Sequence, residues 1–366
     1  MKVLMGMALS LSVLASGNQI IFKKKNSNSI YEKINVSNKN SRSISSIVEE
    51  MNNSGLYEFV EIDTIEKEIE PIYENSKGLE GGWHHTNIRT EQAQNLLTNP
   101  HDVVIAVCDS GFEEGHSDLA GQSVPGHSFV DGTNDTSPNT HHGTMVSGLI
   151  VGLTNQNVNT SGIANHLKVM PLKITSKRGS TSISTIADCI KYAADHGAKV
   201  INVSFTGVNQ RVIQTAGKYA SDRGALLVYA AGNHGLRRKV SNYPDHKNVL
   251  IVGGTEPDNS KWDCGTNCGS NWGHNLDISA PARNIFTTRA NITFGGKEYS
   301  SPSGTSFAAP IVSAVAGLVY SVNPFFTAAE VEDILKQSAF DLGNEYEHGA
   351  GLVDAEKAVS IALSNL

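Results

Sequence analysis

The residues of this chain best suited to covalent chemistry are an aspartate, a histidine and a serine, each at the edge of an expected regular element. Asp109 ends an apolar run, His142 begins an apolar helical run, and Ser306 begins another. A serine hydroxyl attacks a carbonyl carbon only when a base takes its proton, and a carboxylate that orients the base completes the set. The chain order Asp, His, Ser is one of three unrelated orders in which such a triad occurs. These residues therefore predict acyl transfer through an activated serine.

Each of the three residues also has an ordinary role when it is considered alone. Asp109 precedes Ser110-Gly111 and would suit a strand-to-helix turn, and Ser306 would suit a helix N-cap. His141 competes with His142 for the part of the base. The histidine pair lacks the His-Glu-x-x-His pattern, or a carboxylate at ligand spacing, that would favour a metal site. The three segments together favour the catalytic interpretation.

Strands and helices are expected to alternate from His101 onward. Near-continuous Val/Ile/Leu runs predict strands that are covered on both faces. We therefore expect an α/β fold with a doubly wound, mostly parallel sheet and helices on both faces, whose ligands lie at the carboxyl ends of the strands. Asp109 and Asn233 fall at such ends. The expected strands are Val103–Asp109, Leu167–Ile174, Ala198–Phe205, Ala225–Ala231, Asn248–Gly253 and Leu276–Ser279, and the expected helices are Gly143–Gly152, Ile183–His196, Gln210–Arg223, Ser306–Val322 and Ala328–Ser338.

Four segments resemble motifs of the subtilisin-like serine proteases (subtilases), in the family's order and at family-like spacing. The resemblance covers the last three quarters of the chain, from about Trp83 to Ala355. The serine segment is the most specific of the four, and the aspartate segment is weak when taken alone. The segments are Val104–Gly111, Thr140–Thr144, Ala230–Asn233 and Ser303–Pro310.

The resemblance implies a serine-type endopeptidase that hydrolyses peptide bonds in proteins or peptides through an acyl-enzyme, with no cofactor for catalysis. Ser306 would be the nucleophile, His142 the general base and Asp109 the carboxylate that orients the histidine. The side-chain amide of Asn233 would be an oxyanion donor beside the backbone N–H of Ser306. The family often has a second histidine where this chain has Met145, a departure that should not affect the chemistry.

The resemblance also implies that the substrate lies extended and pairs with the protein as an added strand. The family usually has a glycine where this chain has Thr206, so we expect the β-carbon there to narrow the site. One wall of the specificity pocket is expected at Ser204, Phe205, Thr206 and Gly207, and the opposite wall at Ala230, Ala231 and Gly232.

Asp118 lies in a segment, His116–Leu119, that resembles the family segment whose aspartate ligates a structural calcium ion. The loop Thr154–Thr160 could add the carbonyl oxygen of Gln156. Calcium needs about six or more oxygen ligands, and Asp118 is the one carboxylate we can assign. An ordinary surface turn is therefore the open alternative.

Residues 1–17 have the pattern of a secretory signal peptide: a basic residue, an apolar run and then small residues. These are Lys2, Val3–Leu14 and Ala15-Ser16-Gly17. An ordinary buried helix is the alternative. Gly17 stands where a lipidated cysteine would be needed, which argues against a lipid anchor. The pattern predicts a secreted or periplasmic/extracellular protein without stable membrane insertion.

Residues 18–75 are expected to be a short propeptide-like segment, followed by a peptidase domain over residues 76–366. Ile44, Ile47, Val48 and Met51 have helical spacing and Tyr57–Asp63 alternates like a strand, so a small αβ unit is expected. In the subtilases a comparable segment assists folding and blocks the cleft as an intramolecular inhibitor until it is removed. An exported linker with no partner is the alternative.

Charge and cysteine content restrict the remaining possibilities. The net charge of −7, with no basic cluster in the motif region, argues against a nucleic-acid partner. We expect Cys264 and Cys268 to close a small surface disulfide, and Cys108 and Cys189 to be buried apolar side chains instead of a pair. We expect a monomer.

Two rival functions remain. A catalytically silent binding or inhibitor protein on the same fold would need a damaged triad or oxyanion donor, and neither is damaged in this sequence. A hydrolase of esters or lipids would normally carry a Gly-x-Ser-x-Gly turn, which is absent around Ser306.

Overall fold

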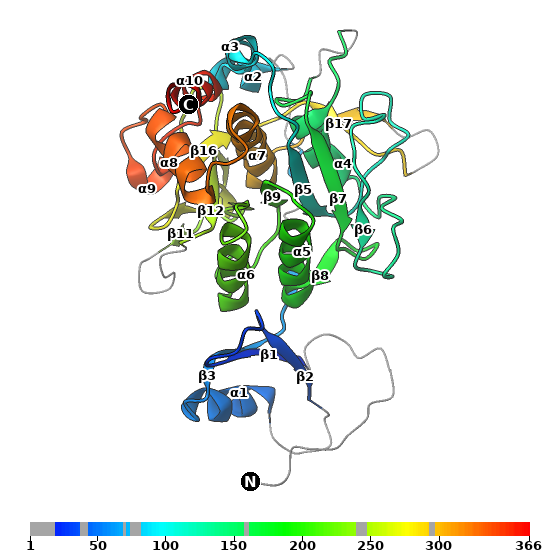
Figure 1. Cartoon of the computed structure of the whole chain (residues 1–366), viewed down its shortest axis with the longest axis vertical. Coiled ribbons are helices and arrows are strands. Elements are labelled where there is room, and N and C mark those ends of the chain that lie inside the picture. Colours follow the sequence, from blue (N-terminus) through cyan, green and yellow to red (C-terminus); the bar gives the residue numbers. More distant parts are fainter. Residues whose placement is uncertain are drawn as a thin grey trace. The chain divides into compact units, whose positions relative to one another are not determined.

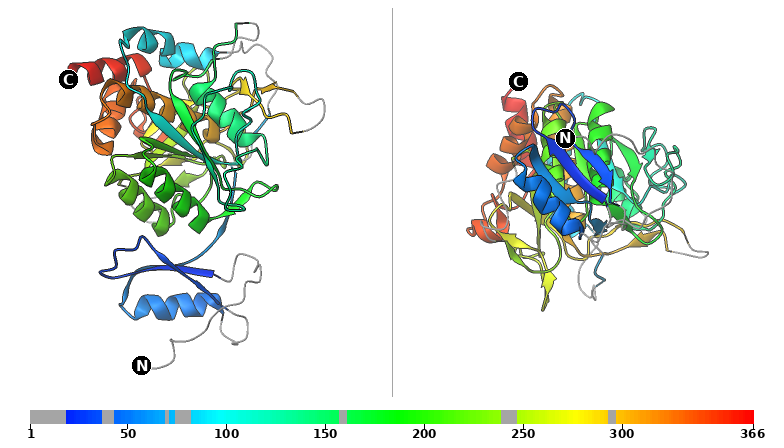
Figure 2. Two further views of the ribbon diagram at one scale, coloured as in Figure 1. Left: turned by 45° about the vertical axis from the view of Figure 1, so that its right-hand side comes forward. Right: turned by 90° about the horizontal axis from the view of Figure 1, so that it is seen from below.

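The chain divides into two compact units, Met1–Ile65 and Glu66–Leu366, which are drawn in Figures 1 and 2. The computed structural model describes residues 19–36, 43–68, 71–73, 82–156, 161–238, 247–292 and 297–366. The expected signal peptide at residues 1–17 lies outside the described residues.

The smaller unit is one helix packed on a three-stranded antiparallel sheet (Figure 1). Ile20, Phe22 and Val60 of the sheet form its core against the apolar face of the helix. The expected helix and strand at residues 44–51 and 57–63 are both present, and β1 and β2 complete the sheet. The elements are β1 (Gln19–Lys24), β2 (Glu32–Asn35), α1 (Ile44–Asn53) and β3 (Tyr57–Ile62), with sheet order β2-β1-β3.

The larger unit is built on a seven-stranded sheet of order β16-β12-β10-β9-β5-β7-β6. Every pair of neighbouring strands in it is parallel, so the expected doubly wound α/β fold is confirmed. The central strands are buried from end to end, as their continuous apolar runs predict. The strands are β5 (Val104–Asp109), β6 (His127–Ser128), β7 (Lys168–Lys173), β9 (Val200–Val203), β10 (Leu226–Ala230), β12 (Leu250–Thr255) and β16 (Ile278–Pro281).

Helices cover both faces of this sheet (Figure 2). Helices α4 (His142–Val151) and α7 (Thr305–Val322) pack together, and α5 (Ile183–Asp195) and α6 (Arg211–Ser221) pack together on the other face. Among the described residues, α7 is the one helix long and apolar enough to cross a membrane, and 94% of it is buried inside the protein. Its place between the sheet and the outer helices is that of a core helix.

Short elements complete the larger unit. Helix α3 packs against the C-terminal α10, and an ion pair joins Arg89 to Asp354 at the start of α10. The sequence analysis did not anticipate α2, α3, α9 and α10. The elements are β4 (Ile65–Lys67), α2 (Trp83–Ile88), α3 (Thr90–Leu96), β8 (Ser180–Ser182), β11 (Arg237–Arg238), β13 (Asp263–Gly265), β14 (Cys268–Gly269), β15 (Trp272–Gly273), β17 (Thr287–Thr288), β18 (Tyr299–Ser300), α8 (Ala328–Ser338), α9 (Glu345–His348) and α10 (Ala355–Ser364).

Two disulfide bonds are present. Cys264–Cys268 closes the small loop that was expected. Cys108–Cys189 contradicts the expectation of two unpaired buried cysteines. Helix α5 packs on β5 and brings the two Cα atoms to 6.2 Å, which lies within the range a disulfide can span. This bond therefore ties a core strand to the helix that covers it.

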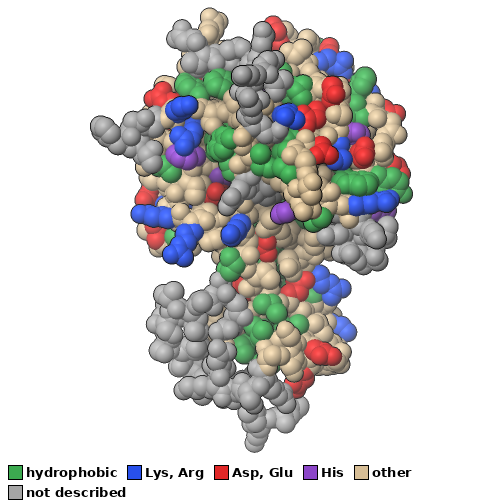
Figure 3. Space-filling model, turned by 180° about the vertical axis from the view of Figure 1, so that it is seen from behind, with side chains coloured by type: hydrophobic (Ala, Val, Ile, Leu, Met, Phe, Trp, Pro, Cys, Tyr) green, Lys and Arg blue, Asp and Glu red, His purple; other side chains and the backbone are tan. Residues whose placement is uncertain are grey.

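On the face drawn in Figure 3, basic and acidic side chains are interspersed instead of being segregated by sign. Individual pairs connect elements: Asp195, at the end of α5, accepts hydrogen bonds from Tyr219 of α6 and from Arg223 just after it. Such exposed pairs each contribute little to stability, about 0–1 kcal/mol.

Candidate active site

Asp109 and His142 lie in direct contact at the carboxyl edge of the sheet. Asp109 is the last residue of β5 and His142 the first of α4. The Nδ1 atom of His142 is 2.9 Å from Oδ1 and 3.0 Å from Oδ2 of Asp109, and both side chains are only 1% exposed. A neutral imidazole that donates its Nδ1–H to a carboxylate carries no proton on Nε2, and in that form Nε2 is able to act as a base.

Close backbone packing fixes this pair. The backbone N–H of Ser110 donates to Oδ1 of Asp109 at 2.7 Å, and the N–H of Gly143 donates to Oγ of Ser110 at 2.9 Å. A β-carbon on Gly143 would collide with the carbonyl oxygen of Gly111. The glycine after His142 is therefore required by the approach of α4 to β5, which explains the local His-Gly-Thr pattern.

Burial and charge act in opposite directions on His142. Burial lowers the pKa of the imidazole, but the adjacent Asp109 carboxylate and the carboxylate of Glu68 outweigh it, so the pKa is raised. Within the described part of the chain, the buried Nε2 atom has no hydrogen-bond partner. His141, the rival base, accepts a bond from Arg289 at Nε2, and its Nδ1 bonds to the carbonyl oxygen of Ala290. The ring of His142 alone is directed at the Asp109 carboxylate.

Ser306 is a buried residue in the first turn of α7. Pro310, four residues later, has no N–H to bond the carbonyl oxygen of Ser306, and the hydroxyl of Ser204 donates to that oxygen instead at 3.0 Å. The ring of Phe307, the next residue, is 5.5 Å from the ring of His142, measured between centroids. The starts of α4 and α7 therefore meet.

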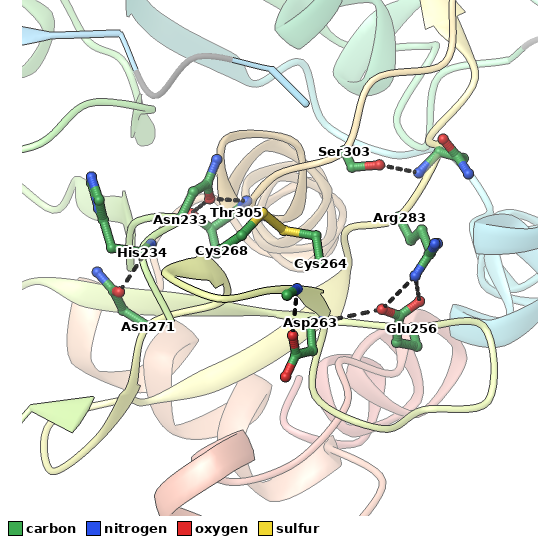
Figure 4. The surroundings of a disulfide bond; sticks show 12 residues. Asn233, His234, Glu256, Asp263, Cys264, Cys268, Asn271, Arg283, Ser303 and Thr305 are labelled. Carbon is green, nitrogen blue, oxygen red and sulfur yellow. Dashed lines mark hydrogen bonds and ion pairs between the residues drawn. A yellow bond between two sulfur atoms is a disulfide. The ribbon is translucent and has the colours of Figure 1, made fainter. Parts of the chain in front are cut away.

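Asn233 lies just beyond β10 with its amide oriented by Thr305 (Figure 4). The backbone N–H and the hydroxyl of Thr305 both donate to Oδ1 of Asn233 at 2.9 Å. Its buried Nδ2 has no partner among the described residues. A β-carbon placed on Gly304 would lie 2.9 Å from this Nδ2 and 3.1 Å from Oγ of Ser306. The amide donor and the serine oxygen thus flank one small space.

The side chain of Asn271 holds the loop that carries Asn233. Its Oδ1 accepts the backbone N–H groups of His234 at 3.2 Å and Leu236 at 2.9 Å, and its Nδ2 donates to the carbonyl oxygen of Ala231 at 2.9 Å. Figure 4 shows Asn271 beside His234, with the Cys264–Cys268 bond close to Asn233. The sequence analysis missed Asn271, because an asparagine in a Gly/Asn-rich stretch gives no sign of its partners.

Comparison with known proteins identifies the family. Residues 101–351 match the sequence model of the subtilase family, peptidase S8. The chain belongs to the subtilase family. It is 32% identical over 277 residues to subtilisin Savinase of Lederbergia lenta, covering 75% of this chain and 97% of that protein. It is 35% identical over 260 residues to thermitase of Thermoactinomyces vulgaris, covering 70% and 88% of the two chains.

A longer relative is the cell wall-associated protease of Bacillus subtilis (strain 168), which is 34% identical over 281 residues. The alignment covers 75% of this chain and only 30% of that protein. The family and these protease relatives make this subtilase a serine-type endopeptidase, which confirms the resemblance that the four motifs indicated.

A segment of the larger unit of this subtilase lies extended along the wall predicted for substrate. The backbone N–H of Glu68 donates to the carbonyl oxygen of Gly179 at 2.9 Å, and Glu68 bridges to Phe205 in antiparallel fashion. Further along, Ile72 and Ser303 exchange backbone hydrogen bonds of 3.0 and 2.7 Å. The described residues of this segment thus pair with the backbone at Gly179, Phe205 and Ser303, in the added-strand manner expected of a substrate.

The wall predicted at residues 204–207 lies beside this segment. Ser204 and Phe205 are fully buried, and Thr206 donates its hydroxyl to Oε2 of Glu66 at 2.6 Å. We expected the β-carbon of Thr206 only to narrow the site, whereas its hydroxyl also supplies a hydrogen bond. Gly207 lies in the segment that follows β9, and a β-carbon on it would collide with the side chain of Glu66. The residues of the other predicted wall, Ala230–Gly232, lie at the end of β10 and directly after it.

Asp118 is held by side-chain hydrogen bonds, and the calcium site suggested by its motif stays a prediction. The side chains of Ser117 and Asn155 donate to its Oδ1 at 3.1 and 3.0 Å, and the hydroxyl of Tyr299 donates to its Oδ2 at 2.9 Å. Calcium needs about six or more oxygen ligands. Gln156 is exposed, and the loop beyond it, residues 157–160, lies outside the described residues. The described contacts of Asp118 are those of a structural hydrogen-bond acceptor.

Proposed function

We propose that this subtilase is an exported endopeptidase, made as a precursor, that uses Ser306 as nucleophile, His142 as general base and Asp109 as its orienting carboxylate. The observation that supports this most is the buried pair of His142 and Asp109, with Nε2 unpartnered in the described chain, at the junction of α4 with the serine-bearing end of α7.

In this proposal Oγ of Ser306 attacks the carbonyl carbon of the scissile peptide bond while its proton passes to Nε2 of His142. The Asp109 carboxylate stabilises the imidazolium that forms. The oxyanion accepts hydrogen bonds from Nδ2 of Asn233 and from the backbone N–H of Ser306, which lies in a first helical turn. His142 then protonates the leaving amine and activates the water that hydrolyses the acyl-enzyme.

We further propose that residues 18–75 act as an intramolecular inhibitor until they are removed. The backbone pairing of Glu68 with Gly179, and of Ile72 with Ser303, supports this because it fills the strand position of a substrate. The domain boundary at residue 75 and the monomeric state remain predictions. The signal-like pattern of residues 1–17 supports export, and the name of the cell wall-associated relative is compatible with an extracellular location.

The test is the Ser306→Ala variant. We expect it to fold normally, to lose casein hydrolysis and fluorophosphonate labelling, and to keep residues 18–75 attached. Circular dichroism and N-terminal sequencing of the secreted protein provide the controls. Full activity or labelling in the variant would refute the assignment of the nucleophile.

The occupied cleft also favours a second candidate, a catalytically silent protein whose leader is never removed. N-terminal sequencing of the wild-type protein separates the two functions. A mature N-terminus beyond residue 72, together with labelling of Ser306, supports the protease, and an intact leader with no labelling supports the silent protein.

A further inference from the structure

The strand that enters the cleft exposes an apolar side chain and buries acidic ones. In β4 and the residue after it, Ile65 is 45% exposed and Lys67 is exposed, whereas Glu66 and Glu68 are each only 9% exposed. Successive side chains of a strand point to opposite faces, so the two acids share the inner face. Glutamate is almost never buried unless it is paired. The surface that receives these acids must therefore supply built polar partners.

The partners of Glu68 are two threonine hydroxyls. Thr140 donates to both carboxylate oxygens at 2.9 Å, and the fully buried Thr175 donates to Oε1 at 3.4 Å. Gly179, with φ of +65°, completes the pocket: a β-carbon there would lie 3.0 Å from Oε2 of Glu68. Three separate segments thus converge on one carboxyl group: the turn before α4, the residue after Ile174, and the loop before β8.

Within the described chain, the hydrogen-bond partners of the Glu68 carboxyl group are uncharged hydroxyls and include no cation. Burial raises the pKa of Glu68 to about 7, with the charge of His142 lowering it and that of Asp109 raising it. The two hydroxyl bonds lower the pKa, but burial is the larger effect, and a hydroxyl can also donate to the carbonyl oxygen of an uncharged carboxyl or carboxamide group. The pocket is therefore chemically suited to glutamic acid in its neutral form and to glutamine.

We propose that Thr140 and Thr175 form a specificity subsite that binds the side chain of a glutamate or glutamine in peptide substrates, at the position that pairs with Gly179 and Phe205. The inference rests on the proposed function, because it takes the segment at Glu68 as occupying the substrate path. It adds the substrate class: peptides with a carboxyl or carboxamide group two methylene carbons from the backbone Cα at that position.

The first test compares peptide substrates that differ only at this position, using the processed enzyme at pH 6. We expect kcat/KM to be about tenfold higher for Glu and Gln than for Leu or Lys. In Thr140→Val and Thr175→Val the ratio of Gln to Leu should fall toward one, while Thr140→Ser and Thr175→Ser keep it. Comparing two substrates within each variant removes any loss of activity that affects both substrates equally. This correction is needed because the hydroxyl of Thr140 also accepts the backbone N–H of His142.

A matched control is Thr206→Val, which removes the hydroxyl that contacts Glu66 and should leave the ratio at the Glu68 position unchanged. Equal kcat/KM for Gln and Leu in the wild type, or an unchanged ratio in both valine variants, would overturn the proposal.

The second test does not need catalysis. In the full chain carrying Ser306→Ala, hydrogen exchange of the amide at position 68 reports its bond to Gly179. With Glu68→Gln we expect the protection factor of this amide to stay within about threefold of that of the parent chain. With Glu68→Leu we expect the protection factor to fall about tenfold. Equal or greater protection with leucine would refute the subsite. Lack of activity on every peptide would count against the proposed function, and the exchange result would still decide the subsite.

Discussion

The docking of Glu68 in the cleft should weaken as pH rises. Its pKa is about 7 in the folded structure, against a reference value of 4.5 for an unperturbed glutamate. A carboxyl group whose pKa is raised on docking binds its proton more tightly in the docked state. Docking is therefore most favourable below pH 4.5, loses free energy as pH rises to about 7, and changes little above that value.

The magnitude follows from the size of the pKa difference. One pKa unit corresponds to about 1.4 kcal/mol, so the shift sets an upper limit of about 3 kcal/mol on the free energy lost. The undocked fraction should then increase by up to about two orders of magnitude between pH 5 and pH 8. The charges of His142 and Asp109 also act on the pKa of this carboxyl group, and protonation of His142 reduces the change.

The assay uses the full chain with Ser306→Ala, which by the proposed mechanism is unable to process itself. An added protease cleaves the segment around residues 66–73 only when it leaves the cleft, and mass spectrometry follows the rate. The same chain with Glu68→Gln has a side chain of the same shape with no proton to lose, so its rates provide the correction for the pH response of the added protease. We expect the cleavage rate of the Glu68 chain, divided by that of the Glu68→Gln chain, to rise from pH 5 to pH 8. A flat or falling ratio would refute the reasoning.

Three further predictions concern the catalytic loop and the core. Asn233→Ala should lower kcat with little change in KM; in subtilisin itself the loss of one such donor costs about 10²–10³ in kcat, a value carried over from that relative and checked here by steady-state kinetics. Asn271→Ala leaves three backbone groups of the loop without their partner, so urea unfolding should show a loss of about 1–3 kcal/mol and kcat should fall. Loss of the Cys108–Cys189 bond in the double serine variant should cost about 2–5 kcal/mol in the same unfolding measurement, while the variant lacking the Cys264–Cys268 bond, which closes a far shorter loop, should lose less.

The sequence predicted the parts of the fold that depend on local patterns. The strand ending at Asp109 and the helix beginning at His142 are visible as apolar runs, and parallel topology then places both at one edge of the sheet. The bond between Cys108 and Cys189 was missed because burial alone explains both residues, and 81 residues separate them. Helix α10 was missed because its packing depends on contacts made far back in the chain.

The specificity subsite that binds Glu68 could not be predicted from the sequence, for a different reason. Glutamate side chains are mostly exposed in proteins, so the sequence of β4 alone gives no sign that Glu66 and Glu68 are buried. The hydroxyls that bind Glu68 belong to Thr140 and Thr175, which lie 72 and 107 residues away in sequence. Threonines of this kind are common at turns, so only the three-dimensional contact distinguishes them.

The contacts of Glu68 connect occupancy of the cleft with the reactivity of the base. When ionised, Glu68 is a second carboxylate near His142, after Asp109, and both raise the pKa of the imidazole. In the proposed mechanism His142 takes the proton of Ser306, which an imidazolium cannot do, so an ionised Glu68 would lower the share of His142 that is competent as a base. A neutral Glu68 leaves that share unchanged but docks more tightly. The segment would therefore oppose catalysis on both sides of the pKa of Glu68. Below that pKa the segment is docked more tightly in the cleft, and above it the ionised carboxylate favours a protonated His142. Only departure of the segment removes both effects, since it opens the strand position beside Gly179 and leaves Asp109 as the partner of His142.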